Sequence, residues 1–108
     1  MAVKIYSLKE HGNTKLSTNF TVKEFACKDG SDKVLIDTAL VDVLQKIRDY
    51  FGKPVIINSA YRSPEHNKRV GGSAGSYHVK GMAADIQIAG VSAVELAYYA
   101  QTITNGVG

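Results

Sequence analysis

The densest group of polar residues lies between Asn58 and Asp85, and His78 with Asp85 is its best candidate metal-binding pair. The two residues are seven positions apart, and Asp85 interrupts an apolar run at 82–86. A lone carboxylate in a buried strand is costly unless it is paired or binds a cation. Zinc takes imidazole nitrogen and carboxylate oxygen, and its catalytic sites combine three protein ligands with a water. The pair is therefore a candidate for part of a zinc site.

A simpler interpretation of the same two residues stays open. Asp85 would cap a backbone turn and His78 would be an ordinary surface histidine, and the spacing alone favours this alternative. Gly81 lies between them and would let the chain turn back so that the two side chains converge. The other polar residues of the group sit mostly in loops or at strand ends, where a rigid scaffold commonly carries functional sites.

Two short apolar segments are expected to position this group. Residues 55–57 are typical of a buried strand, and residues 83–88 of a second core strand. Between them, Ser63-Pro64 has the pattern of a helix N-cap followed by proline at the first helical position, which predicts a short helix through about Val70. Gly71 and Gly72 would end that helix and open a loop of small residues.

The clearest helix should begin after Asp37, a good N-cap, and stop at Gly52. Its apolar residues recur at helical spacing: Leu40, Val43, Leu44, Ile47, Tyr50 and Phe51. Capping-box patterns at 21–24 and 92–95 predict a short helix to about Cys27 and a final helix ended by Asn105-Gly106. The final helix would turn four apolar residues inward: Leu96, Ala97, Ala100 and Ile103.

This order of elements predicts an α+β domain, with a small, mainly antiparallel sheet and helices packed against it. Residues 1–8 alternate loosely and would add an edge strand. The chain has 108 residues, of which 44% are hydrophobic and 21% charged, so we expect one globular domain over 1–108.

Composition argues against several function classes. The formal net charge is +3 and no run of Lys or Arg exceeds two residues, so we expect no nucleic-acid partner. No apolar run approaches the roughly 18 residues that span a bilayer. Residues 1–10 lack the pattern of a signal peptide, so the protein is expected in the cytoplasm until it is released. The mild positive charge suits an anionic polymer such as a bacterial cell wall.

The single cysteine, Cys27, excludes an intrachain disulfide and a cysteine-rich zinc site. We expect it to be a small buried hydrophobe. A catalytic thiol would need a histidine beside it, and no histidine is near Cys27 in the sequence.

Four spaced motifs together resemble one family. Residues 76–86 (SYHVKGMAADI) are similar to the S-x-H-x-x-G-x-A-x-D signature of the D-Ala-D-Ala carboxypeptidase-type zinc metallopeptidases. Residues 59–62 (SAYR), 66–72 (HNKRVGG) and 20–27 (FTVKEFAC) resemble that family's S-x-Y-R, H-N-x-x-x-G-G and F-x-x-x-E-F-x-C segments. The last is seen in the phage and bacterial peptidoglycan hydrolase branch. The resemblance implies the fold shared by these peptidases and the hedgehog signalling domain.

The resemblance also implies roles for individual residues. His78 and Asp85 match two zinc ligands. Arg62 matches a catalytic, substrate-binding arginine that holds the substrate carbonyl or carboxylate and stabilises the oxyanion, a task that suits its paired donors. Ser76 matches a serine that binds substrate near the metal. His66 matches a position that is not a ligand, and we expect it to contact the adjacent loop backbone.

The family's third ligand is a histidine on the last strand of the sheet, with a catalytic Asp or Glu just before it. No histidine follows His78 here, so we expect a truncated or degenerate family member that lacks this strand. Two protein ligands would hold zinc weakly, and the 108 residues alone would be inactive or poorly active. The sheet edge left behind would be open, covered by a loop or paired with another molecule.

The leading hypothesis is thus a zinc peptidase that hydrolyses stem or cross-link peptides of peptidoglycan, as a carboxypeptidase or an endolysin-like endopeptidase in a phage or prophage context. The alternatives are a non-catalytic cell-wall or ligand-binding module on the same fold, and a plain structural domain.

Overall fold

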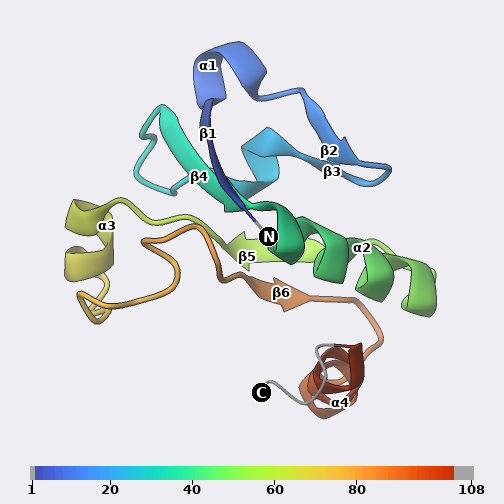
Figure 1. The fold of residues 1–108 in the computed structure, drawn as a ribbon. Coiled ribbons are helices and arrows are strands. Elements are labelled where there is room, and N and C mark those ends of the chain that lie inside the picture. The colour runs from blue at the N-terminus through green and yellow to red at the C-terminus, as the bar shows by residue number, and fades with distance from the viewer. Residues whose placement is uncertain (1, 104–108) are drawn as a thin grey trace.

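A computed structural model describes residues 2–103 of the chain (Figure 1). Its strands form three separate two-stranded antiparallel sheets, pairing β1 with β4, β2 with β3, and β5 with β6. The helix α2 packs against β2 and β4 on one side and against α4 on the other. The predicted α+β class is confirmed, although the expected single small sheet is divided into three ribbons.

The N-terminal half forms two of the ribbons. The strand β1 (Val3–Ser7) pairs with β4 (Lys33–Asp37), which confirms the predicted strand near the N-terminus. Between them lie α1 (Leu8–His11), β2 (Lys15–Ser17) and β3 (Phe20–Thr21). A short 3₁₀-helix, η1 (Val22–Phe25), follows β3 and precedes β4.

The capping box at 21–24 forms as predicted, and the short helix that it opens is a 3₁₀ turn that ends at Phe25 and not at about Cys27. The Glu24 carboxylate accepts hydrogen bonds from the backbone N–H of Thr21 at 2.7 Å and from its hydroxyl at 3.1 Å. Val22 and Phe25 are fully buried, and η1 contacts β3, β4 and β5. This turn therefore lies at the centre of the core that joins the two halves of the chain.

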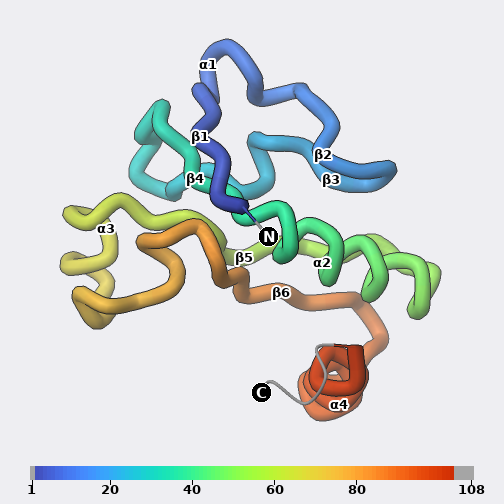
Figure 2. Tube along the Cα trace, viewed as in Figure 1, coloured from blue at the N-terminus to red at the C-terminus, as the bar shows by residue number. Residues whose placement is uncertain are grey.

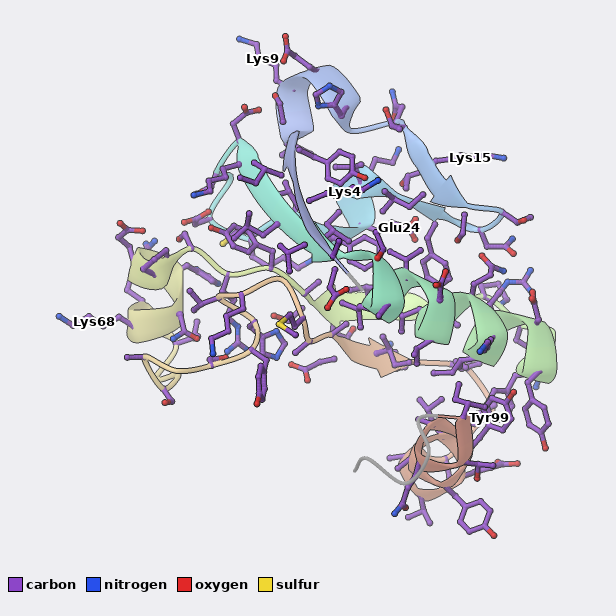
Figure 3. All side chains as sticks on the ribbon, viewed as in Figure 1. Lys4, Lys9, Lys15, Glu24, Lys68 and Tyr99 are labelled. Carbon is purple, nitrogen blue, oxygen red and sulfur yellow. The ribbon has the colours of Figure 1, made fainter. Side chains whose placement is uncertain are left out.

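The helix α2 (Thr38–Phe51) has the predicted bounds. The Asp37 carboxylate accepts from the N–H of Ala39 at 2.9 Å, and Gly52 adopts the left-handed conformation with φ 64°. The prediction that Tyr50 joins the buried face was wrong, because its side chain is exposed. It stacks on Tyr99, with ring centroids 3.8 Å apart. Tyr99 is on α4 and is labelled in Figure 3. A helix of this length covers only a stripe of core, and position 50 falls beyond its edge.

The strands β5 (Ile56–Ser59) and β6 (Asp85–Gln87) form the ribbon that carries the candidate site. Ile57 faces Ile86 across the ribbon, and the register shifts between Ile57 and Ser59. Both strands were expected to be buried throughout, yet Ile56 and Asp85 are exposed. Successive side chains of a strand point to opposite faces, and only one face of this ribbon is covered.

The helix α3 (Pro64–Arg69) starts at the predicted N-cap, because the Ser63 hydroxyl accepts from the N–H of His66 at 3.2 Å. The loop 70–84 then runs back beside residues 59–64 and leads into β6 (Figure 2). Its return brings residues far apart in the sequence to the end of β5.

The last described helix, α4 (Ala93–Ile103), is capped by the Ser92 hydroxyl, which accepts from the N–H of Glu95 at 3.1 Å. Leu96 is buried as expected, whereas Ala97 is exposed, because α4 meets the rest of the domain along a narrow stripe. The predicted stop at Asn105-Gly106 lies outside the described residues. None of the helices that the structure describes is long and apolar enough to cross a membrane.

Candidate functional site

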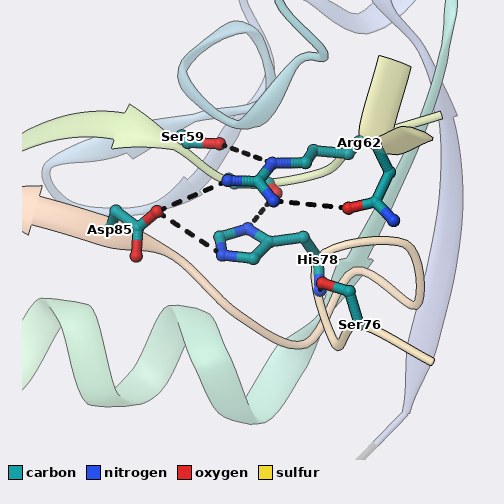
Figure 4. Close-up of polar contacts among 7 residues, drawn as sticks. Ser59, Arg62, Ser76, His78 and Asp85 are labelled. Atoms are coloured by element: carbon teal, nitrogen blue, oxygen red, sulfur yellow. Dashed lines mark hydrogen bonds and ion pairs between the residues drawn. The ribbon is translucent and has the colours of Figure 1, made fainter. Parts of the chain in front are cut away.

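The end of β5, the returning loop and the start of β6 bring Arg62, His78 and Asp85 together (Figure 4). The His78 Nε2 lies 3.5 Å from the Asp85 Oδ2. The Arg62 Nη2 lies 3.7 Å from the same carboxylate oxygen. We call these three residues the open cluster. The structure thus places three of the four predicted site residues in direct contact.

Backbone hydrogen bonds hold the loop against the segment that follows β5 and against the end of β4. The His78 carbonyl accepts from the N–H of Arg62 at 3.1 Å and of Gly81 at 3.2 Å, and the Gly81 carbonyl accepts from the N–H of Asp37 at 2.9 Å. Gly81 has φ 75°, and a Cβ there would lie 2.4 Å from the carbonyl oxygen of Leu35. Only glycine fits this turn, which confirms the predicted reversal between His78 and Asp85.

A hydrogen bond at Nδ1, the ring nitrogen that faces away from Asp85, fixes the orientation of the His78 ring. Its Nδ1 lies 2.7 Å from the Ala60 carbonyl oxygen. A carbonyl can only accept, so this bond places a proton on Nδ1, and in the neutral imidazole the lone pair is then on Nε2, which faces Asp85. Metal-binding histidines are commonly held in this way, with one ring nitrogen bonded to the protein and the other directed at the ion.

Arg62 is held on three sides. Its Nε donates to the Ser59 hydroxyl at 3.3 Å and its Nη1 to the Asn67 Oδ1 at 3.3 Å, while Nη2 faces Asp85. Asn67 is buried on α3, and its Nδ2 donates to the Ser73 carbonyl at 2.7 Å. The guanidinium plane is therefore oriented before any ligand binds.

Asp85 is open to solvent, with 61% of its side chain exposed. This corrects the expectation that the carboxylate lies in a buried strand. The alternative in which Asp85 caps a backbone turn is also not what the contacts show, since the carboxylate faces Arg62 and His78. A groove of about 440 Å³ between α2, β6 and α4 runs past Asp85.

Ser76 takes a different place from the other predicted residues. Its hydroxyl accepts from the N–H of His78 at 3.2 Å, so it supports the backbone of the histidine and makes no described contact with Arg62 or Asp85. Within residues 2–103, no further His, Cys, Asp or Glu joins His78 and Asp85 as a third metal donor.

Sequence reasoning missed a second group of ligand-type side chains. The ligand atoms of Cys27, Asp29 and His66 all lie within 4.8 Å of one another, and we call these residues the closed cluster. Cys27 is buried as predicted, and although no histidine is near it in the sequence, α3 brings His66 to it in the fold. Hydrogen bonds from Ser31 and Ser63 hold the pKa of Asp29 well below its usual range. No spacing rule could have revealed this contact between distant segments.

Comparison with known proteins gives a family for the chain. A family model described as Peptidase M15 matches residues 18–108, a range that includes both clusters. Neither the curated proteins nor the solved structures contain a match. The family match covers most of the chain and contains the motifs that position Arg62, His78 and Asp85, and we conclude that this chain belongs to the peptidase M15 family.

Proposed function

We propose that the chain is a zinc-dependent peptidase domain in which His78 and Asp85 are two of the metal ligands. The observation that carries this proposal is the distance of 3.5 Å between His78 Nε2 and Asp85 Oδ2. Two nitrogen or oxygen donors on a tetrahedral zinc ion lie about 3.3 Å apart, given bond lengths of about 2.0–2.1 Å. The two donors therefore need almost no movement to share one ion.

The charges around this pair also suit a cation. The Nδ1–H bond to Ala60 selects the neutral tautomer whose Nε2 lone pair faces Asp85, and Asp85 brings a negative charge. The exposed face of Asp85 leaves room for a further ligand and for substrate. A bound zinc ion would supply Lewis acidity that polarises a substrate carbonyl and acidifies a water.

Arg62 is the residue that we assign to substrate. Its guanidinium is oriented by Ser59 and Asn67 and lies beside the metal ligand Asp85. Donors fixed at the place where negative charge develops are a major source of catalysis in acyl transfer. We therefore assign Arg62 to the scissile carbonyl oxygen or to a substrate carboxylate, and Ser76 to substrate contact or to support of His78.

The substrate class that we propose is the stem or cross-link peptide of peptidoglycan, cleaved by carboxypeptidase or endolysin-like endopeptidase action after the protein is released from the cytoplasm. Membership of a peptidase family supports peptide hydrolysis. The open position of the site suits a polymer, and the net charge of +3 suits an anionic wall.

One observation favours a second candidate, a wall-binding module without catalysis. Within residues 2–103 the open cluster offers two protein donors to a metal, and no further carboxylate lies beside it as a general base. Such a site would bind a peptide carboxylate through Arg62 without cleaving it.

The test begins with zinc binding. Wild-type protein and the H78Q, D85N and H11Q variants are dialysed against trace zinc and the bound metal is measured. His11 lies on α1 and provides the matched control. We expect H78Q and D85N to lose one equivalent that H11Q keeps. Equal zinc content in all four proteins would overturn the assignment of the site.

Purified cell walls then separate the two functions. Release of new amino termini that depends on zinc and on His78 supports the peptidase. Sedimentation with walls without such release supports the binding module. If the protein neither binds the walls nor releases new amino termini from them, the proposed substrate class is contradicted.

A further inference from the structure

The closed cluster joins two segments of the chain that are far apart in sequence. Cys27 and Asp29 lie in the loop between η1 and β4, and His66 is on α3. One sulfur, one carboxylate oxygen and one imidazole nitrogen lie within 4.8 Å of one another. None of these residues belongs to the open cluster, and none has a role in the proposed hydrolysis.

Burial distinguishes this cluster from a catalytic thiol. Cys27 is only 4% exposed, so a substrate cannot reach its sulfur. The Asp29 side chain is 13% exposed although the residue as a whole is exposed through its backbone, and His66 is half-buried. A nucleophile needs access to a substrate, whereas a small ion needs only the donor atoms and one coordination position that water can reach. The enclosure therefore favours an ion over a reaction.

Ser63 holds two of the donors from behind. Its backbone N–H donates to the Cys27 Sγ at 3.4 Å, and its hydroxyl donates to the Asp29 Oδ2 at 2.7 Å. Ser63 is itself buried and is the N-cap of α3, the helix that carries His66. Partners of this kind orient the ligands of a metal and are a regular part of metal sites.

We propose that Cys27, Asp29 and His66 form a zinc-class metal site that fastens the loop before β4 to α3. Thiolate, imidazole and carboxylate are all donors that zinc accepts, and the thiolate disfavours magnesium and calcium. On binding, the Cys27 thiol releases its proton to solvent, and thiolate and carboxylate together balance the two positive charges of the ion. The exposed backbone around Asp29 leaves the fourth position to water.

The geometry requires a modest closure. Donors around a tetrahedral zinc lie about 3.3–3.8 Å apart, and the three donor atoms all lie within 4.8 Å of one another, so no pair has to approach by more than about 1.5 Å. The Arg69 Nη2 lies 3.9 Å from the Asp29 Oδ2 on a side chain that is mostly exposed, and it can move away when the ion takes over the carboxylate. Because α3 also carries Asn67, which holds Arg62, the ion would steady the helix behind the open cluster.

Cobalt provides a direct test, because a thiolate bound to Co²⁺ gives a charge-transfer band in the near ultraviolet. The fully reduced wild-type protein is titrated with Co²⁺ and compared with the C27S, D29N, H66Q, H78Q and H11Q variants. We expect the band in the wild type, H11Q and H78Q proteins, its loss in C27S, and at least about a tenfold weaker affinity in D29N and H66Q. No band in folded wild-type protein would overturn the proposal.

Affinity that is equal in wild type, D29N and H66Q would also overturn it, because the metal would then bind the thiol alone. Should C27S fail to fold, D29N and H66Q carry the test, since both positions are polar and closer to solvent. Thermal unfolding gives an independent measure in the H78Q background, which lacks a ligand of the open cluster: zinc should raise Tm in H78Q and not in the H66Q/H78Q double variant. A zinc-dependent rise that survives in the double variant would contradict the site.

Because H78Q leaves the closed cluster intact, failure of this site and failure of the proposed peptidase site give different results. If the wild-type protein gives no cobalt–thiolate band but still binds zinc in a way that depends on His78, only the closed-cluster site is contradicted. The opposite pattern would remove only the proposed function.

Discussion

The open and closed clusters contain similar ligand chemistry in different surroundings. Each has one histidine and one aspartate, yet the Asp85 side chain is 61% exposed and the Asp29 side chain 13% exposed. The open cluster adds an arginine, and the closed cluster adds a buried thiol. Ligand identity alone therefore does not separate a site for chemistry from a site for stability, whereas access of solvent and substrate does.

A single segment, residues 59–67, supplies both clusters. Arg62 belongs to the open cluster and contacts Ser59 and Asn67. His66 belongs to the closed cluster, and Ser63 donates a hydrogen bond to its Asp29. Neighbouring residues of an extended chain point in opposite directions, and neighbouring residues of a helix point about 100° apart. A short extended stretch that leads into α3 can therefore serve both sites.

The largest expected effect is the loss of wall hydrolysis when the histidine of the open cluster is replaced. Replacing His78 with Gln removes a ligand of the open cluster, and we expect any zinc-dependent wall hydrolysis to fall by more than about 100-fold. Amino-terminus release from purified walls measures it, with H11Q as the control that keeps the wild-type rate. Loss of activity in H11Q as great as in H78Q would show that histidine removal acts through the fold.

The turn at Gly81 provides the next largest effect. A left-handed conformation costs an alanine about 1–2 kcal/mol, and the added Cβ would also meet the backbone of Leu35. We expect G81A to lose more than about 2 kcal/mol in urea unfolding. Gly71 has a similar φ of 80° with nothing within 4 Å of an added Cβ, so G71A should lose only about 1 kcal/mol.

The same pair of variants sharpens the comparison of the clusters. G81A displaces the loop of His78 and should weaken zinc binding at the open cluster while it leaves the cobalt–thiolate band in place. Equal losses of stability in G81A and G71A would mean that the contact with Leu35 has no energetic effect.

Asn67 tests the connection between the clusters. It is buried, accepts from Arg62 and donates to the Ser73 carbonyl. We expect N67A to lose about 1.5 kcal/mol of stability, because a charged donor and a carbonyl each lose a partner. N67D keeps the acceptor for Arg62 and should retain more wall binding than N67A. Indistinguishable wall binding in the two variants would show that Arg62 does not need this support.

Much of the open cluster was predictable, because its information is local. Gly81 between His78 and Asp85 requires a turn with a backbone contact that only glycine permits, and Ser63-Pro64 fixes the start of α3. The exposure of Asp85 was not predictable from its apolar neighbours, because it depends on which face of a two-stranded ribbon is covered.

The closed cluster shows where sequence reasoning ends. Cys27 and His66 meet only because η1 packs against β5 and α3 follows β5 after a few residues. These contacts depend on core packing around Val22 and Phe25, which no short pattern encodes. The same limit applies to Tyr50, whose helical spacing was right while its neighbours left it exposed.

Asp32 is an aspartate outside both clusters whose carboxylate is hydrogen-bonded by the protein itself. Its replacement should give the smallest of the predicted effects. Asp32 accepts from the N–H of Lys9 at 2.7 Å and from the Ser7 hydroxyl at 2.8 Å, and these bonds lower its pKa. A pKa lower in the folded than in the unfolded state stabilises the fold above the unfolded value of about 3.9, and this contribution is lost as pH falls toward the folded value. D32N should therefore lower Tm slightly at pH 7, and the difference from wild type should shrink below about pH 4. Zinc should leave that difference unchanged, whereas it should widen the gap between wild type and D29N. A gap between wild type and D32N that grows with zinc would mean that metal binding does not distinguish the closed cluster from an ordinary hydrogen-bonded carboxylate.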